Sequence, residues 1–431
     1  MIRSAAPSAP LPSDIDVAVI GAGAAGVAAA RRLMRSELSV VVLEARDRIG
    51  GRALTLPFDG EGLDMGCGWL HSAEDNVLAA RVEAEGLTLD KTPAPWESQA
   101  FNHEMTAEEQ ADFRQAFADF EDRVAEAAGR GEDRPAAELF DPACRWNPRM
   151  DAISGALNGA RFGSVSTIDY DAYRDTGVNW RVREGYGRLI ARLGRAVEPV
   201  LVADCAVRVI DRGGQRLRLE TSRGAVEADA VILTTPVSLI AAEAVRIEPP
   251  VPALLDAAAG VPLGLASKVH MTVTGAEDFP ADSQLWTRSD TPQTGGYHLR
   301  PFGRAMIEGY FGADLAWGLE AEGEAAAFDF AVSELVAALG SDMRRRLAPA
   351  AVTRWGADPF SRGAYSHALP GRSGDRARLR EAVEDRIFLA GEATSRNDYG
   401  TAHGAWAEGE RAAEAVLAAL GLPSDRSSLR G

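Results

Sequence analysis

The sequence VAVIGAGAAG occupies residues 17–26, close to the start of the chain. An apolar run precedes three glycines, and an alanine-rich segment continues to about Arg35, which predicts a strand, a tight turn and a helix. In such a unit Gly21 permits the turn, Gly23 lets a pyrophosphate approach the backbone, and Gly26 lets the helix pack against the strand. Ala25 lies in the first helical turn, where backbone amides attract phosphate. We therefore expect an α/β fold with a Rossmann-like domain that binds a dinucleotide.

A second apolar run at residues 40–43 ends in Glu44, eighteen residues after Gly26. An acidic side chain at this distance accepts hydrogen bonds from the ribose of an adenosine. Three glycines in a chain rich in alanine and glycine also arise from ordinary packing. Here the strand, turn, helix and acidic residue follow one another in the order that dinucleotide binding requires.

The residues after Glu44 read Ala45-Arg46-Asp47-Arg48-Ile49-Gly50-Gly51-Arg52 and resemble the second signature of the flavin-containing amine oxidase family. The resemblance implies that the dinucleotide is FAD, bound by the residues Glu44, Ala45, Arg46, Gly51 and Arg52. Physically, Gly51 allows the backbone to pass beside the phosphates, and Arg52 offers a fork of donors to anionic oxygens. A salt-bridged surface arginine is the alternative for Arg46, Arg48 and Arg52.

Near the C-terminus, residues 386–394 read RIFLAGEAT and residues 403–406 read HGAW, which matches the C-terminal FAD motif of the same family. The match implies that Gly391 permits close approach and that Glu392 accepts hydrogen bonds from the ribityl-pyrophosphate region. The helix that begins near Ala402, just after Thr401, is expected to aim its amides at the flavin pyrimidine carbonyl. Val207 matches a family valine at the adenine end, although a valine in a core strand needs no cofactor.

Residues 64–71, Asp-Met-Gly-Cys-Gly-Trp-Leu-His, resemble the family segment that runs past the flavin ring. The resemblance places Gly66, Cys67, Gly68 and Trp69 beside the cofactor. Polyamine oxidases often have a histidine where His71 stands, and a neutral imidazole can take a proton from an ammonium substrate. A structural histidine is the alternative.

Alternation in residues 265–273 predicts a strand with Lys268 and His270 on one face. By resemblance, Lys268 reaches the flavin N5 through one water; a lysine that protects a strand edge is the alternative. Trp355 corresponds to the family residue beside the flavin, and Tyr365 to one wall of the aromatic cage that flanks the amine.

Two positions depart from the best-known relatives. Ala364 occupies the place of the cysteine that bonds to the flavin in mammalian monoamine oxidases, so FAD is expected to be non-covalent. Thr401 replaces the second tyrosine of the cage, as in animal polyamine oxidases and lysine-specific histone demethylases. This widens the predicted pocket and favours a longer or bulkier amine.

The resemblance implies a flavin-dependent amine oxidase, in which a hydride passes from the carbon beside a neutral amine to the flavin. Water hydrolyses the resulting imine, and dioxygen is reduced to peroxide. An L-amino acid oxidase is an alternative that needs an arginine for the substrate carboxylate, with Arg174, Arg288 and Arg300 as candidates. An FAD-dependent desaturase or porphyrinogen oxidase, and an FAD scaffold without turnover, are further alternatives. The sequence leaves open which amine is oxidised, whether the acceptor is dioxygen, and whether the chain forms a homodimer.

Bulk composition agrees with a cytoplasmic enzyme. The formal net charge of −17 argues against a nucleic-acid partner. Three widely separated cysteines argue against a disulfide framework and a metal site. No segment is predicted to cross a membrane.

The 431 residues predict two interleaved domains. We assign residues 14–75, 191–260 and 340–422 to the FAD-binding domain, and residues 76–190 and 261–339 to a substrate-binding domain of mixed sheet and helices. Residues 1–13 and 423–431 are expected to be tails. A capping box at residues 106–109 begins a helix whose phenylalanines, Phe113, Phe117 and Phe120, are expected in the core. Residues 217–221 and 230–233 predict a hairpin, and the aromatic residues Trp286, Tyr297, Tyr310, Phe311 and Trp317 are candidates to line the substrate pocket.

Overall fold

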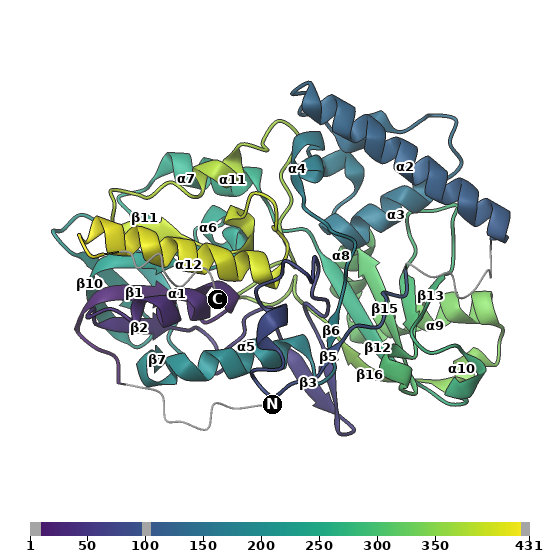
Figure 1. Cartoon of the computed structure of the whole chain (residues 1–431), viewed down its shortest axis with the longest axis horizontal. Coiled ribbons are helices and arrows are strands. Elements are labelled where there is room, and N and C mark those ends of the chain that lie inside the picture. Colours follow the sequence, from purple (N-terminus) through teal and green to yellow (C-terminus); the bar gives the residue numbers. More distant parts are fainter. Residues whose placement is uncertain (1–9, 97–104, 424–431) are drawn as a thin grey trace.

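The computed structural model of the chain describes residues 10–96 and 105–423. The tails expected at residues 1–13 and 423–431 lie almost wholly outside these ranges. Figure 1 shows two sheets: one at the left, crossed by α1 and α12, and one at the right, below α2 and α3. The predicted α/β fold, with a Rossmann-like unit and a second sheet, is confirmed, but the second sheet is antiparallel rather than mixed.

The first sheet is built around parallel strands that are buried on both faces. Its strand order is β11-β8-β9-β10-β1-β2-β7, with β17 paired to β10. The strands are β1 Asp14–Ile20, β2 Val40–Leu43, β7 Leu201–Val202, β8 Val207–Asp211, β9 Leu217–Thr221, β10 Gly224–Leu233, β11 Arg246–Glu248 and β17 Ile387–Leu389. Strand β1 lies between β10 and β2 and is parallel to both. The apolar runs of β1, β2 and β10 thus form the centre of the sheet.

The predicted hairpin is also confirmed, because β9 and β10 pair antiparallel. Its second strand is longer than the sequence indicates and begins at Gly224, directly after the turn.

Two helices cover one face of this sheet, α1 (Ala24–Leu33) and α12 (Ala402–Ala419). They pack closely because Gly409 has no side chain. A Cβ at Gly409 would lie 2.1 Å from the carbonyl oxygen of Ala25. The two predicted FAD motifs therefore meet at a helix pair, although almost 400 residues of sequence separate them.

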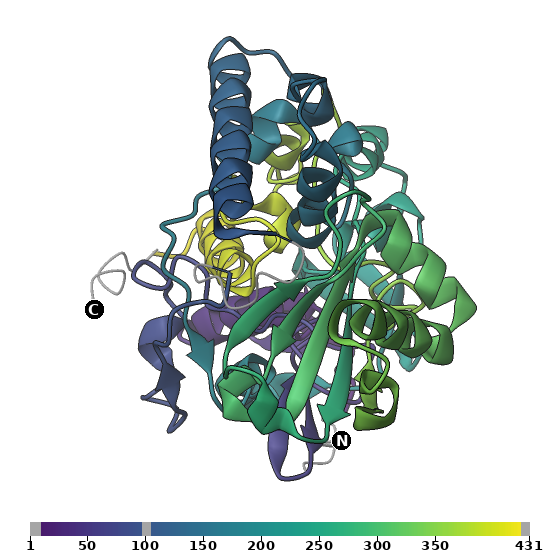
Figure 2. The same ribbon diagram turned by 90° about the vertical axis from the view of Figure 1, so that its right-hand side faces the viewer.

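The second sheet is antiparallel, in the order β13-β14-β15-β12-β16. Its strands are β12 Ala266–Val273, β13 Ser283–Trp286, β14 Gly296–Leu299, β15 Met306–Gly312 and β16 Leu347–Val352. Helices α8 (Ala313–Glu322), α9 (Glu324–Leu339) and α10 (Met343–Arg346) lie between β15 and β16 along the chain and pack beside the sheet (Figure 2).

This sheet corrects two interpretations of the sequence. Strand β12 lies between β15 and β16, so Lys268 is on a central strand and the edge-lysine alternative is wrong. Strand β16 pairs with β12, so the second sheet extends past the predicted boundary at residue 339. The sequence does not indicate this strand, because β16 is short and reads Leu-Ala-Pro-Ala-Ala-Val, without a clear alternation.

A helical insertion lies above the second sheet in Figure 1 and contains α2 (Ala107–Gly129), α3 (Asn147–Asn158) and α4 (Thr167–Ala172). The predicted capping box is present, with Thr106 and Glu109 each bonded to the other's backbone amide. Phe120 is buried in the core of the insertion, as predicted. Phe113 and Phe117 are only partly buried and contribute to a cavity wall.

The remaining regular elements are short, apart from α5 and α7. They are β3 Thr55–Phe58, β4 Glu61–Asp64, β5 Leu89–Asp90, β6 Arg181–Val182, α5 Tyr186–Gly194, α6 Val237–Ala241, α7 Pro252–Gly260 and α11 Asp375–Arg378. Among residues 10–96 and 105–423, the helices are too short or too polar for one to reach across a lipid bilayer.

Candidate active site

A cavity of about 1180 Å³ extends from the end of β1 to the helical insertion. Residues of every predicted site segment line it. The lining includes Gly21, Gly23, Ala25, Glu44, Ala45, Arg46, Gly51, Arg52, Gly66, Cys67, Gly68, Trp69, His71, Val207, Lys268, Trp355, Tyr365, Gly391, Glu392, Thr401 and Ala402. The fold thus brings the dispersed candidate residues to one space.

Gly26 is the predicted site residue that does not line the cavity. It permits the tight contact between α1 and the turn instead. A Cβ at Gly26 would lie 1.8 Å from the carbonyl oxygen of Gly21, whose φ of +101° itself favours glycine.

Glu44 is held at the end of β2 by two backbone amides. Its carboxylate accepts hydrogen bonds from Ala22 N at 2.7 Å and Arg46 N at 2.9 Å, and the residue is only 3% exposed. A carboxylate oxygen can accept more than one hydrogen bond, so capacity remains for hydroxyl groups in the cavity. Beside it, α1 begins at Ala24, and the first amides of a helix have no intrahelical acceptor.

The two predicted arginines differ in their contacts. Arg46 donates from Nη2 to Asp358 Oδ1 at 2.6 Å and to Ser361 Oγ at 3.0 Å. Its side chain is only 13% exposed and lines the cavity, so it forms an ion pair without being a surface arginine. Arg52 forms an ion pair from Nη1 to Glu392 Oε1 at 3.1 Å. This contact joins the N-terminal motif to the C-terminal one.

Glu392 is buried, and both of its carboxylate oxygens have partners in the protein. Its Oε2 accepts hydrogen bonds from Ser366 Oγ at 2.6 Å and Gly400 N at 2.9 Å. Burial opposes ionisation, but Arg52 and the Ser366 hydrogen bond hold the pKa of Glu392 below its ordinary value. The side chain is therefore a fixed carboxylate at the wall of the cavity.

His367 lies next to Ser366 and gives a testable pH effect. It is 5% exposed, its Nδ1 has no hydrogen-bond partner within the described chain, and burial together with Arg376 lowers its pKa to about 4.

The unfolded chain has a histidine pKa of about 6.5, so below this pH it binds a proton that the folded protein does not. We expect stability to fall as pH falls from about 6.5 toward 4. In melting curves across this range, His367→Phe should show a smaller decline than the wild type; parallel declines would contradict the assignment.

Trp355 is held near the segment predicted to pass the flavin ring. The indole is buried, and its Nε1 donates to Met65 O at 2.8 Å. A Cβ at Gly66 would lie 3.5 Å from Trp355 Cζ2 and 1.7 Å from Arg52 O, so this position requires glycine. Burial raises the pKa of the neighbouring Cys67 to about 12, which keeps it a neutral thiol.

Lys268 occupies a buried cluster of charges on the floor of the cavity. Its Nζ lies 3.4 Å from Glu308 Oε1, and Nδ1 of His270 lies 3.5 Å from Glu308 Oε2. Burial opposes the charge of Lys268, but Glu308 and Asp64 outweigh it and raise its pKa. The geometry therefore keeps an ammonium group at the cavity.

Sequence reasoning missed Glu308, which faces Lys268 and His270 only because β12 and β15 pair in one register. In that register His270 is opposite Glu308 and Lys268 is opposite Tyr310. The composition of the chain holds a further signal for Lys268, because Lys91 and Lys268 are the only lysines among the 46 lysines and arginines. A chain that uses arginine almost everywhere retains a compact ammonium here.

Tyr365 contacts a second tyrosine, Tyr310. Their hydroxyl oxygens are 3.1 Å apart, and the Tyr365 hydroxyl donates to Ala156 O, so Tyr310 donates to Tyr365. Tyr310 and Trp286 line the cavity, as predicted. The other aromatic candidates do not: Tyr297 and Phe311 are buried in the core of the second sheet, and Trp317 is exposed. The sequence could not separate them, because each strand has two faces.

His71 lines the cavity. Its Nδ1 lies 2.7 Å from Asn179 Oδ1, which only accepts, so Nδ1 carries the hydrogen and Nε2 keeps a lone pair. Burial lowers the pKa of His71, so the ring is neutral near pH 7.

Thr401 is engaged in helix capping. Its hydroxyl accepts from Gly404 N at 3.0 Å and donates to Asp398 O at 2.6 Å. The single hydroxyl hydrogen is therefore used within the protein, and the residue contributes shape to the cavity wall rather than a donor.

The three arginines considered for an amino acid carboxylate lie elsewhere. Arg174 pairs with Asp398, Arg288 with Asp290, and Arg300 donates to Phe279 O. None of the three is among the described residues that line the cavity. These contacts remove the candidates on which the L-amino acid oxidase alternative depended.

Comparison with known proteins places this architecture in a family. The model of flavin-containing amine oxidoreductases matches residues 24–126 and 102–417. The chain is 28% identical to polyamine oxidase 4 of Oryza sativa subsp. japonica over 94% of this chain and 90% of that protein. It is 27% identical to lysine-specific histone demethylase 1 homolog 2 of the same plant, over 95% of this chain and 58% of that protein.

Two solved structures share the fold. Putrescine oxidase, in a structure bound to putrescine, superposes with a TM-score of 0.76 at 21% identity, over 94% of this chain and 100% of that chain. Cyclohexylamine oxidase from Brevibacterium oxydans IH-35A gives a TM-score of 0.75 at 20% identity, over 95% and 100%. The chain belongs to the family of flavin-containing amine oxidoreductases.

Proposed function

We propose that this FAD-dependent amine oxidoreductase oxidises a diamine or polyamine at a C–N bond and passes the electrons to dioxygen. The observation that carries the proposal is the single cavity shared by the nucleotide motifs and by Lys268, Trp355 and Tyr365. We also place the protein in the cytoplasm, because its three cysteines are free thiols.

The residues present fit FAD. Gly23 leaves open space beside the turn, because a Cβ there would meet only Gly51 Cα, at 3.9 Å, and Glu44 supplies an oriented carboxylate. Thr235 lines the same cavity, and its buried Oγ1 has no hydrogen-bond partner in the described parts of the chain. Glu44 would accept hydrogen bonds from the adenosine ribose, Arg52 would donate to the pyrophosphate, and Glu392 would accept hydrogen bonds from the ribityl hydroxyl groups. Gly66 and Trp355 would flank the ring.

Bound FAD supplies an acceptor for the hydride that leaves the carbon beside the amine nitrogen. The protein's own residues would orient the amine and manage its protons. An ammonium has no lone pair to support hydride loss, so the proton must leave first. Nε2 of neutral His71, a residue that lines the cavity, would accept it. Tyr365 and Tyr310 would form one wall beside the amine. The Lys268 ammonium would hold a water by donating a hydrogen bond.

The residues that line the cavity near the helical insertion favour an elongated cation as substrate. Glu121, Asp171 and Asp175 line this part of the cavity, together with apolar groups such as Leu157 and Trp286. Carboxylates separated by apolar surface match amines separated by methylene groups. The relatives named polyamine oxidase and the fold shared with putrescine oxidase point in the same direction.

Peroxide release from a panel of monoamines, diamines and polyamines tests this substrate class. We expect the highest kcat/KM for a polyamine. Glu121→Gln combined with Asp171→Asn should raise KM for the polyamine by about fivefold and leave that for a monoamine unchanged, because each exposed charge contributes little. Asp119→Asn, on the same helix but outside the cavity lining, is the control. A preference for monoamines that survives in all variants would contradict the proposal.

FAD is expected to be released by acid. Ala364 offers no sulfur to bond to the flavin, and its carbonyl accepts a hydrogen bond from Arg52. After acid precipitation of the yellow protein, the colour should remain in the supernatant. A yellow pellet would show a covalent link and refute the placement of Ala364.

A further inference from the structure

We propose that Arg376 is a positioning residue that couples the FAD-holding carboxylate of Glu392 to the helical insertion. FAD binding and order in the amine-side wall of the cavity then depend on each other. The inference rests on the proposed place of Glu392 in the FAD site.

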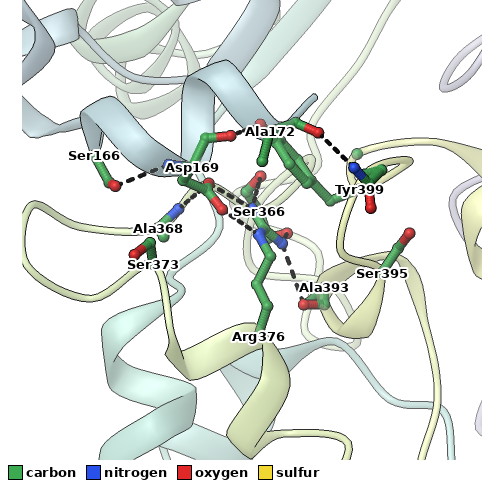
Figure 3. Close-up of polar contacts among 12 residues, drawn as sticks. Ser166, Asp169, Ala172, Ser366, Ala368, Ser373, Arg376, Ala393, Ser395 and Tyr399 are labelled. Atoms are coloured by element: carbon green, nitrogen blue, oxygen red, sulfur yellow. Dashed lines mark hydrogen bonds and ion pairs between the residues drawn. The ribbon is translucent and has the colours of Figure 1, made fainter. Parts of the chain in front are cut away.

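The proposed coupling depends on a buried ion pair between Arg376 on α11 and Asp169 on α4. Arg376 Nε lies 2.6 Å from Asp169 Oδ1, and Nη2 lies 2.9 Å from Oδ2, so both carboxylate oxygens are bound (Figure 3). Both side chains are only 3% exposed. Such a pair adds little stability over apolar residues of similar size, but it fixes geometry, and loss of one partner leaves a buried charge.

A chain of hydrogen bonds runs from Arg376 to the FAD side. Arg376 Nη1 donates to Ser366 Oγ at 2.8 Å and to Ala393 O at 3.1 Å. Ser366 Oγ lies 2.6 Å from Glu392 Oε2. Because a guanidinium only donates, the single Ser366 hydroxyl hydrogen must point to Glu392. Arg376 thus sets the direction of the hydrogen bond that holds this carboxylate.

On the other side, the same ion pair holds the wall of the cavity at the insertion. Asp169 Oδ2 also accepts from Ala368 N at 2.8 Å, and its backbone oxygen accepts from the Tyr399 hydroxyl. The Arg376 guanidinium lies 3.7 Å from the centre of the Tyr399 ring. Tyr399 lines the cavity, as do Tyr170 and Asp171 directly after Asp169.

Arg376 therefore has contacts on both sides. It reaches the Glu392 carboxylate through the Ser366 hydroxyl, and it binds α4 directly through Asp169. If FAD favours the ordered arrangement of Glu392, it must also favour the ordered arrangement of α4, because coupling between two sites is reciprocal. Ser366 is the residue in this series of hydrogen bonds that is easiest to remove by mutation, because its side chain contributes only the hydroxyl.

Ser366→Ala tests the coupling while it leaves the ion pair in place. We expect FAD affinity of the apoprotein, measured by flavin fluorescence, to fall about tenfold, as for one lost hydrogen bond to a charged group. In the wild type, FAD should slow hydrogen exchange at residues 166–173. In Ser366→Ala at saturating FAD, hydrogen exchange at residues 166–173 should no longer be slowed by FAD. Exchange at residues 21–27 should still be slowed.

Arg376→Lys should give the same two changes, and the double variant should be no worse than the single ones. Arg378→Lys is the control, because Arg378 lies on the same helix and pairs instead with Asp256 and Asp375. Wild-type affinity and full protection at residues 166–173 in Ser366→Ala would overturn the inference alone. Failure of the wild-type apoprotein to bind FAD would overturn the proposed function instead.

Discussion

Replacement of Lys268 by methionine is expected to slow flavin reoxidation by dioxygen by about 100-fold, the effect of removing one oriented group that stabilises developing charge. The ammonium is buried beside the cavity, 3.4 Å from Glu308, and its raised pKa keeps it positive. A positive charge at this place favours transfer of electrons to dioxygen, which becomes negative. Methionine keeps the length of the side chain but removes both the charge and the donor.

Stopped-flow measurement of the reductive and oxidative steps separates the two places where Lys268 could act. Lys91→Met is a matched control, because Lys91 is the only other lysine and lies over the ring of Trp180, outside the cavity lining. It should leave both rates unchanged. Wild-type rates for both steps in Lys268→Met would remove the residue from the mechanism.

The second large effect is expected from Gly26→Ala, which should abolish FAD binding. The new Cβ would lie 1.8 Å from Gly21 O and 3.2 Å from Thr234 Oγ1, so the turn must move. Displacement of the turn removes the close approach that a pyrophosphate needs, and overpacking costs about 3 kcal/mol of stability.

Gly318→Ala provides the comparison, because Gly318 also lies within a helix but nothing is within 4 Å of its Cβ position. This variant should bind FAD normally and be slightly more stable, since alanine favours helix by about 1 kcal/mol over glycine. For both variants, flavin content after purification measures FAD binding, and the melting temperature of the apoprotein measures stability. Full flavin content in Gly26→Ala would contradict the close-packing argument.

Local sequence patterns predicted the parts of the site that depend on the backbone. Gly21, Gly23 and Glu44 have fixed spacing within one strand-turn-helix-strand unit, so their positions follow from the chain itself. Helix α12 and the capping box before α2 were predictable for the same reason.

Contacts between distant segments could not be predicted in this way. Glu308 faces Lys268 only in the observed register of β12 and β15, and Arg376 meets Asp169 across 207 residues of sequence. Tyr297 and Tyr310 looked equivalent in sequence, yet one is buried in the core and the other lines the cavity. Strand pairing and the choice of face decide these roles, and neither is encoded in a short window.

Anaerobic titration of the purified yellow protein with a polyamine tests the account most directly. Without dioxygen, electrons taken from the amine must stay on the cofactor, so the visible flavin absorbance should disappear in proportion to the amine added and return when air is admitted. A protein that is colourless and does not take up FAD, or a flavin that keeps its colour with every amine, would contradict the account.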